Sequence, residues 1–356
     1  MKKVYIVLED GHIFEGKAFG AEGETLGELV FTTSVVGYVA TLTDPRYYGQ
    51  IILQTFPLIG NYGYISEQRE SDKVWAKAFI AREWCENPSN FRCEKTLDEY
   101  LKEQGVIGVY DVDTREITQL IRENGVMNAK IVSSLDDIDY DEIKNYKIEN
   151  AVAAVSDGET KVYGQDNDGA AVTVVNFGYD KNAVKDLLNL GMKVTSVSAS
   201  STAEEILATN PQGVVLSDGP GNPAENESAI AEVSKLVGKL PIFGLGLGHL
   251  VLALANGAET SKLKFGHRGS NQPVKSLKTG KTYITSQNSG YTVNAESLEK
   301  CGGEVAFINV NDGTCEGVDY KDKNAFSVQY HPEAGLRDRD VDKIFDRFAA
   351  MLGGND

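Results

Sequence analysis

The sequence is poor in the residues from which cross-links and metal sites are built. It holds four cysteines and four histidines in 356 residues. No two cysteines have CxxC spacing, so we expect free cytosolic thiols rather than a disulfide framework or a zinc site. No apolar run approaches the ~18 residues of a membrane span. We therefore expect a cytoplasmic protein with no membrane contact and no metal; the cysteines are Cys85, Cys93, Cys301 and Cys315.

Basic residues are also scarce. Lys and Arg total 35 against 52 Asp and Glu, which leaves a net charge of −17. The negative electrostatic field of such a chain repels phosphate backbones and anionic lipid, so nucleic acid is not an expected partner. Hydrophobic residues make up 41% of the chain, which is enough to bury real cores. The length predicts two domains of ordinary size.

The first 150 residues are predicted to form a strand-rich α/β domain with a few helices. We expect one helix near Val74–Glu86 and a second that opens at Asp113 as N-cap and stops before Gly125. From about Val155 to Gly169 the sequence is polar and rich in glycine, and we predict a linker over residues 151–170. The second domain then covers 171–356.

From residue 171 onward, strand and helix patterns alternate. This rhythm predicts a doubly wound, mostly parallel sheet covered by helices on both faces, with a final helix over Asp338–Leu352. The strands are expected at Ala171–Asn176, Met192–Val197, Gly213–Ser217 and Leu240–Gly244, and the helices at Lys181–Leu190, Ala203–Ala208, Ala224–Val237 and His249–Asn256.

The segment Pro241-Ile-Phe-Gly-Leu-Gly-Leu-Gly-His-Leu250 carries the most information about chemistry. A buried strand runs through three glycines straight into a helix. A dinucleotide-binding turn is one interpretation, but its glycines are spaced differently. A nucleophile elbow, G-x-Nu-x-G, fits the glycines at 244 and 248, yet its middle residue is Gly246, which cannot attack anything. A simple tight turn stays open as the third interpretation.

Two further loops follow predicted strands and could complete such a site. The strand from Ala325 ends in His331-Pro-Glu333, where a histidine and a carboxylate are spaced like a general base and its orienting group. The loop Leu216-Ser-Asp-Gly-Pro-Gly-Asn-Pro223 could offer backbone N–H groups to an oxyanion. Doubly wound sheets bind ligands at this edge, so we expect the three loops to converge.

Together these motifs resemble a class I, triad-type glutamine amidotransferase domain, and the whole chain resembles the carbamoyl-phosphate synthase small-subunit family. The resemblance extends through both halves of the sequence. It includes Leu8-Glu-Asp-Gly11, Leu42-Thr-Asp-Pro45, Phe56-Pro-Leu-Ile-Gly-Asn-Tyr-Gly63, Asp113-Thr-Arg115, Lys264-Phe-Gly-His-Arg-Gly269, Ile284-Thr-Ser-Gln-Asn288 and Asn311-Asp-Gly-Thr314.

The resemblance implies roles for individual residues. In the family a cysteine attacks the carboxamide of glutamine, and the released ammonia passes to a large subunit that makes carbamoyl phosphate for arginine or pyrimidine synthesis. Here His331 would be the base, Glu333 its orienting group, and Gly246 the position of the missing nucleophile. The resemblance places oxyanion and glutamine contacts at Arg46, Gly219, Gly221, Leu247, Leu250, Asn288, Gly290 and Tyr291. No cofactor is implied on this chain, since ATP, bicarbonate and Mg²⁺ belong to the large subunit.

The departures from the family pattern gather at the substrate. The nucleophile is replaced by Gly246, a glutamine by Leu250, a serine by Arg46, and a histidine by Ser289, and G-Y-Q-E reads Gly37-Tyr-Val-Ala40. We therefore predict a glutaminase-dead subunit that still docks on its large subunit through residues 1–150, with glutamine binding in doubt. A cleft that holds an anionic small molecule through Arg46 is the alternative, and glutamine hydrolysis through another nucleophile is a third. A single engineered Cys→Gly change at 246 does not explain the other substitutions.

Overall fold

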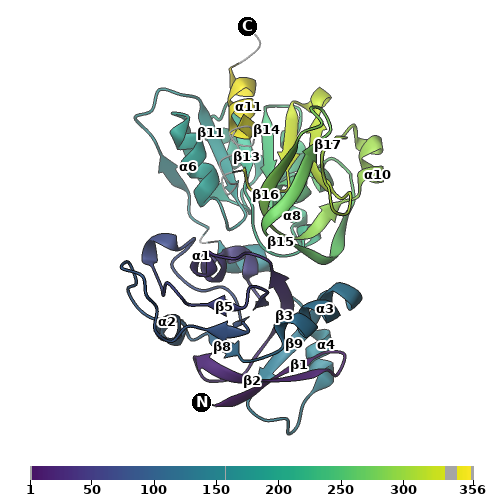
Figure 1. Cartoon of the computed structure of the whole chain (residues 1–356). Helices are drawn as coiled ribbons and strands as arrows, with labels where there is room; N and C mark the ends of the chain where they lie inside the picture. The colour runs from purple at the N-terminus through teal and green to yellow at the C-terminus, as the bar shows by residue number, and fades with distance from the viewer. Residues whose placement is uncertain (1, 157, 333–342, 354–356) are drawn as a thin grey trace. The chain divides into compact units, whose positions relative to one another are not determined.

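The computed structural model describes residues 2–156, 158–332 and 343–353. Its contacts divide the chain into two compact units. Unit 1 comprises Met1–Glu149 with Lys264–Arg268, and unit 2 comprises Asn150–Leu263 with Gly269–Asp356 (Figure 1). No helix in the described ranges has both the length and the apolar character needed to cross a bilayer.

Unit 1 is built on a closed barrel with strand order β1-β2-β8-β6-β4-β3-β9. Alternating residues of its strands point inward, and Ile6, Leu29 and Ile51 are fully buried there. The barrel strands are β1 (Lys3–Leu8), β2 (Ile13–Gly20), β3 (Thr25–Thr32), β4 (Gln50–Gln54), β6 (Ala78–Ile80), β8 (Ile107–Tyr110) and β9 (Met127–Val132), and a two-stranded sheet joins β5 (Leu58–Ile59) and β7 (Glu83–Trp84).

Four α-helices accompany the barrel in the described part of unit 1. The predicted helix after Asp113 is confirmed as α3, and the Asp113 carboxylate accepts hydrogen bonds from the N–H groups of Arg115 and Glu116. The predicted helix over 74–86 is wrong, since that segment holds β6 and β7. The helices are α1 (Tyr38–Thr43), α2 (Leu97–Gln104), α3 (Thr114–Asn124) and α4 (Tyr140–Asn145).

Unit 2 contains a ten-stranded sheet of order β10-β12-β11-β13-β14-β19-β18-β17-β15-β16. Its parallel part runs from β12 to β19, which confirms the predicted doubly wound core, and an antiparallel extension continues it. The strands are β10 (Lys161–Tyr163), β11 (Ala171–Asn176), β12 (Lys193–Ser198), β13 (Gly213–Leu216), β14 (Ile242–Leu245), β15 (Thr260–Ser276), β16 (Thr282–Val293), β17 (Glu304–Asn309), β18 (Cys315–Tyr320) and β19 (Ala325–Val328).

Helices cover both faces of this sheet (Figure 1). One apolar cluster joins α7, α8 and α9 to the sheet, and another joins α6 and α11 to the opposite face. The first part of the predicted helix over 338–352 lies outside the described residues. The helices are α5 (Ala151–Val155), α6 (Lys181–Asn189), α7 (Ala203–Ala208), α8 (Glu227–Leu236), α9 (Leu247–Ala255), α10 (Ala295–Leu298) and α11 (Lys343–Leu352).

The segment predicted as a linker has structure of its own. Residues 151–170 contain helix α5 and strand β10, and β10 pairs with β12 in the large sheet. Contacts of Ala151 with Gly221 and of Val155 with Gly178 tie α5 to loops of unit 2. Most of the expected linker is therefore part of the second unit.

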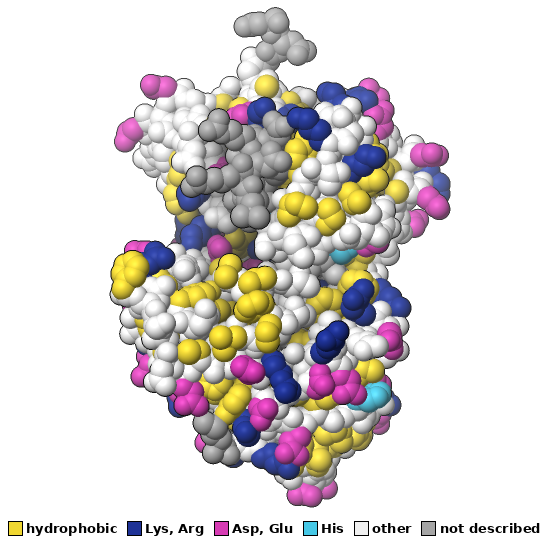
Figure 2. Space-filling view, viewed as in Figure 1, with side chains coloured by type: hydrophobic (Ala, Val, Ile, Leu, Met, Phe, Trp, Pro, Cys, Tyr) yellow, Lys and Arg dark blue, Asp and Glu magenta, His cyan; other side chains and the backbone are white. Residues whose placement is uncertain are grey.

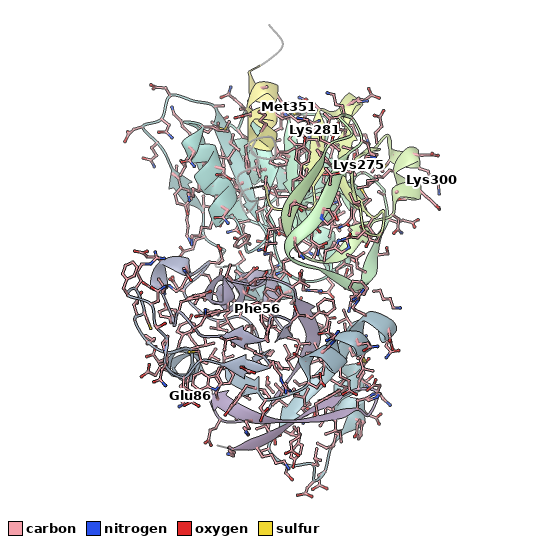
Figure 3. All side chains as sticks on the ribbon, viewed as in Figure 1. Phe56, Glu86, Lys275, Lys281, Lys300 and Met351 are labelled. Atoms are coloured by element: carbon pink, nitrogen blue, oxygen red, sulfur yellow. The ribbon has the colours of Figure 1, made fainter. Side chains whose placement is uncertain are left out.

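On the face that Figure 2 shows, acidic side chains are spread over both units. Large hydrophobic side chains are also exposed in unit 1. One of them, Phe56, follows strand β4 and is labelled in Figure 3; 37% of it is exposed.

Candidate functional site

The predicted elbow is present at the edge of the parallel sheet. Strand β14 ends at Leu245, Gly246 forms the turn with φ 51° and ψ −111°, and α9 begins at Leu247. A positive φ of this kind favours glycine over residues with a side chain. The first turn of α9 also packs closely against the end of β13, since a Cβ at Gly248 would lie 2.2 Å from the Leu216 carbonyl oxygen. The strand–glycine–helix geometry is thus that of a nucleophile elbow.

A carboxylate fills the space above the elbow. Asp218, in the loop after β13, accepts hydrogen bonds through Oδ1 from the backbone N–H of Gly219 at 2.7 Å and of Leu247 at 2.6 Å. These two N–H groups are the oxyanion donors that the resemblance implied. Asp218 Oδ1 therefore occupies the position that a developing oxyanion of an acyl substrate needs.

The second oxygen of the same carboxylate faces the expected base. His331 Nε2 lies 3.1 Å from Asp218 Oδ2, and both side chains are more than nine-tenths buried. The backbone N–H of His331 donates to the backbone carbonyl of Ser286 in β16, and Tyr179 packs edge-on against the imidazole ring. Asp218 thus links the base and both oxyanion donors.

Asp218 also occupies the space that a side chain at 246 would need. A Cβ built on Gly246 lies 2.1 Å from Asp218 Cγ and 2.2–2.4 Å from its two oxygens. Distances below 3 Å cannot coexist with a normal Cβ, so Gly246 and the present position of Asp218 depend on each other. Asp218 was not among the predicted site residues, although an acidic side chain inside an expected oxyanion loop was a visible signal.

The other expected site residues are distributed as follows. Gly219 and Gly221 lie in the Asp218 loop, and a Cβ at Gly219 would lie 2.1 Å from the Phe177 carbonyl oxygen. Leu250 is 3% exposed and belongs to the apolar core under α9. Glu333 falls outside the described residues. Strand β16, whose Ser286 bridges His331, carries Asn288, Ser289, Gly290 and Tyr291.

Arg46 lies in unit 1 and forms an ion pair with Asp44, two residues before it. Its guanidinium meets Asp44 through Nε at 2.8 and 3.0 Å and through Nη2 at 2.8 Å, and the two side chains are 10% and 6% exposed. This bidentate pair neutralises the charge that an anionic ligand would need. The anion-binding alternative stays a prediction, and the surroundings of Arg46 do not favour it.

Helix α9 holds a neutral histidine directly after the elbow. His249 is fully buried, its Nδ1 lies 2.8 Å from Ser327 Oγ, and its Nε2 has no hydrogen-bond partner in the described part of the chain. Burial lowers the pKa of His249 to about 3. His249 is therefore a structural residue rather than a second base.

This burial predicts acid sensitivity. Below the unfolded pKa of about 6.5 the unfolded chain binds a proton that the folded chain excludes, so stability falls by up to about 1.4 kcal/mol per pH unit toward pH 3. His249→Gln is expected to remove this contribution. Urea unfolding between pH 7 and pH 4.5 measures it: the slope of the unfolding free energy against pH should be shallower in the variant. Equal slopes would refute a neutral His249.

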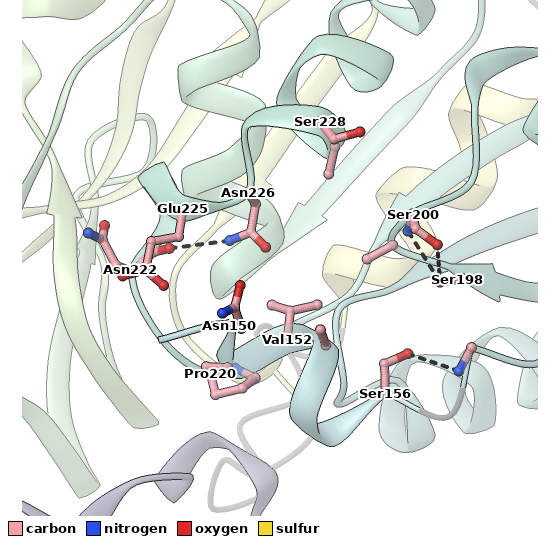
Figure 4. A pocket seen from close by; sticks show the side chains of 15 residues that line it. Asn150, Val152, Ser156, Ser198, Ser200, Pro220, Asn222, Glu225, Asn226 and Ser228 are labelled. Atoms are coloured by element: carbon pink, nitrogen blue, oxygen red, sulfur yellow. Dashed lines mark hydrogen bonds between the residues drawn. The ribbon is translucent and has the colours of Figure 1, made fainter. Parts of the chain in front are cut away.

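A separate pocket of about 350 Å³ lies beside the Asp218 loop (Figure 4). Serine and asparagine side chains line it from the two ends of α5, from the end of β12 and the loop after it, and from the start of α8, and Glu225 is the charged residue among the described lining. Gly246 and His331 do not line it. It is therefore distinct from the elbow site.

Comparison with known proteins places this geometry in a family. Residues 6–131 match the model of the carbamoyl-phosphate synthase small chain, CPSase domain, and residues 173–351 match that of class-I glutamine amidotransferase. The carbamoyl phosphate synthase small chain of Listeria monocytogenes serotype 4b (strain F2365) is 44% identical over 100% of this chain and 98% of its own length. The chain belongs to the carbamoyl-phosphate synthase small-chain family.

Two further relatives extend the similarity across bacteria and archaea. The small chain of Clostridium perfringens (strain 13 / Type A) is 45% identical, covering 97% of this chain and 98% of the relative. That of Archaeoglobus fulgidus is 46% identical over 98% and 99%. The resemblance drawn from the motifs is thereby confirmed at the level of the family and of its amidotransferase domain.

Proposed function

We propose that this chain is a small subunit without glutaminase activity, which binds a carbamoyl-phosphate synthase large subunit that takes free ammonia from solution. The observation that carries the proposal is the position of Asp218. Its carboxylate occupies both oxyanion donors and pairs with His331, over an elbow that has no nucleophile. Family membership supports the partner.

The missing nucleophile alone accounts for a large loss of rate. Removing the nucleophile of a catalytic triad costs on the order of 10⁶-fold in kcat, and the remaining members do not compensate. Asp218 adds a second obstacle, because a substrate carbonyl cannot approach N–H groups that already bind a carboxylate. The proposal is therefore absence of hydrolysis rather than slow hydrolysis.

The cysteines of unit 2 are poor substitutes. Cys315 is buried, and burial raises the pKa of its thiol to about 12. Cys301 is also buried, and its Sγ donates to the Leu298 carbonyl. A thiol must become a thiolate to attack, so neither is suited to that role.

Asp218 itself is equally unsuited to act as nucleophile. Attack by one of its oxygens on a carboxamide would generate an oxyanion that needs the N–H groups of Gly219 and Leu247. Those groups already hold Oδ1, and Oδ2 faces His331. The Asp218 carboxylate therefore occupies the place of a substrate carbonyl and does not act as a nucleophile.

In this proposal the large subunit carries out the synthesis of carbamoyl phosphate and would bind ATP, bicarbonate and Mg²⁺. The small chain would contribute structure or regulation. We propose no cofactor on this chain.

A carbamoyl phosphate assay with the large subunit of the same organism tests this proposal. The complex is expected to form carbamoyl phosphate from ammonium chloride and none above background from glutamine. The large subunit alone is the control, and the small chain is expected to change its ammonia kinetics. Glutamine-dependent synthesis, or a small chain that neither binds nor alters the large subunit, would overturn the proposal.

A further inference from the structure

A cationic cavity in unit 1 stands apart from the site described above. It measures about 970 Å³ and lies between helix α3, the loop after β4 and the segment after β6, with Phe265 among its lining residues. Arg115 and Arg122 reach it from α3, and Arg82 from the segment after β6. We call this cavity, with its three arginines, the α3 cleft.

The arginines of the α3 cleft form no ion pairs within the described part of the chain. Arg82 Nη1 donates to the Val112 carbonyl at 3.3 Å, but none of the three makes an ion pair with another residue of the described ranges. The two acids of the lining have other roles, since Asp113 caps α3 and Glu123 accepts from Gln119. Three such arginines are conspicuous in a chain of net charge −17.

The α3 cleft adjoins exposed apolar side chains. The loop after β3 carries Val35 and Val36, which are 57% and 70% exposed. Phe56 in the loop after β4 and Leu58 at the start of β5 are each 37% exposed. Hydrogen bonds from Gln54 to Ser34 and from Thr55 to Thr32 hold the two loops side by side. In Figure 2, Lys and Arg side chains over α3 lie beside hydrophobic side chains on one face of this unit.

Arginine beside exposed apolar and aromatic groups is the composition of a protein-binding hot spot. A solvated face would offer the charges without the apolar neighbours. The partner must supply carboxylates for the arginines and an apolar contact for the two loops.

We propose that the α3 cleft and these two loops dock an acidic, partly apolar segment of the large subunit. This inference rests on the proposed function and adds to it the place of contact and the charge of the partner. A free small anion would use the arginines alone and would leave the apolar loops uncovered.

Binding of the intact chain to the large subunit, measured by calorimetry at 50 and 300 mM salt, tests the inference. Arg115→Glu/Arg122→Glu is expected to weaken binding at least 100-fold at 50 mM salt and to reverse its salt dependence, because salt screens the repulsion between the new carboxylates and the acidic segment. Arg115→Ala/Arg122→Ala should weaken it by a smaller factor without introducing repulsion. The matched control is Lys275→Glu/Lys278→Glu, which changes the net charge equally at exposed positions of unit 2 and should leave binding unchanged.

The outcomes separate the two proposals. If the wild type binds and the arginine variants bind equally well, the docking site is wrong and the proposed function stands. If the wild type does not bind, the proposed function fails and the docking site fails with it. If sedimentation shows that the arginine variants break up a dimer of this chain instead, the surface belongs to a second copy and the inference is overturned. Thermal melts of both arginine variants confirm that they fold.

Discussion

Gly246→Cys alone is expected to produce no glutaminase and to destabilise the protein. The new Cβ would lie 2.1 Å from Asp218 Cγ, so the carboxylate must leave its two N–H donors and His331. Positive-φ strain costs about 1–3 kcal/mol, and lost hydrogen bonds to a charged group cost about 1.5–3 kcal/mol each. We expect the free energy of unfolding of unit 2 to fall by about 4–9 kcal/mol in total, since two such hydrogen bonds are lost.

Denaturant unfolding measures this effect, and the chain supplies a matched control. Gly238 also has a positive φ, 78°, but a Cβ there meets nothing within 4 Å. Gly238→Cys should therefore show only the strain and lose about 1–2 kcal/mol. Equal losses in the two variants would show that Asp218 does not obstruct position 246.

Recovery of glutaminase is expected to require the removal of Asp218. Gly246→Cys with Leu250→Gln and Arg46→Ser replaces the residues that differ most plainly from the family pattern. In this triple variant the oxyanion donors are still held by the carboxylate, so it should stay at background. Adding Asp218→Ala frees the N–H groups of Gly219 and Leu247, frees His331, and opens space for the thiol.

The fourfold variant should then release glutamate from glutamine at least ~10³-fold faster than the triple variant, toward the ~10⁶-fold that separates active from nucleophile-free triads. Addition of His331→Ala should return it to background, which identifies the base. Similar activity in the triple and fourfold variants would refute the role of Asp218. Restored activity also requires that Glu333 and the glutamine contacts of β16 keep their family roles.

The second unit was largely predictable because its local patterns agree with its fold. The strand over Ala171–Asn176 and the helix over Ala203–Ala208 have the predicted bounds. A capping box at Thr202 and Glu205 fixes the start of that helix. Buried parallel strands between amphipathic helices give an unambiguous rhythm.

The first unit was harder because its short buried strands carry no periodicity. Ala78, Phe79 and Ile80 are all fully buried between β4 and β8, so the segment is a continuous apolar run. Such a run does not distinguish a strand from a buried helix. Likewise, the polar composition of residues 156–169 concealed β10, an edge strand that pairs with β12.

At the site, the sequence motifs predicted which loops come together, but they did not predict the side-chain contacts of Asp218 and Arg46. Gly246, Leu247, Gly219 and His331 come together as the order of strands requires. Asp218 was overlooked because its role depends on a rotamer that turns its carboxylate back over the elbow, and local sequence does not encode that direction. The pairing of Arg46 with Asp44 was missed for the same reason.

Release of labelled glutamate from glutamine by the wild-type chain, in the presence of the large subunit, tests the central claim most directly. The account predicts a rate no higher than that of the large subunit alone, because the elbow has no nucleophile and Asp218 holds the oxyanion donors. Turnover above that rate, abolished by His331→Ala, would contradict it.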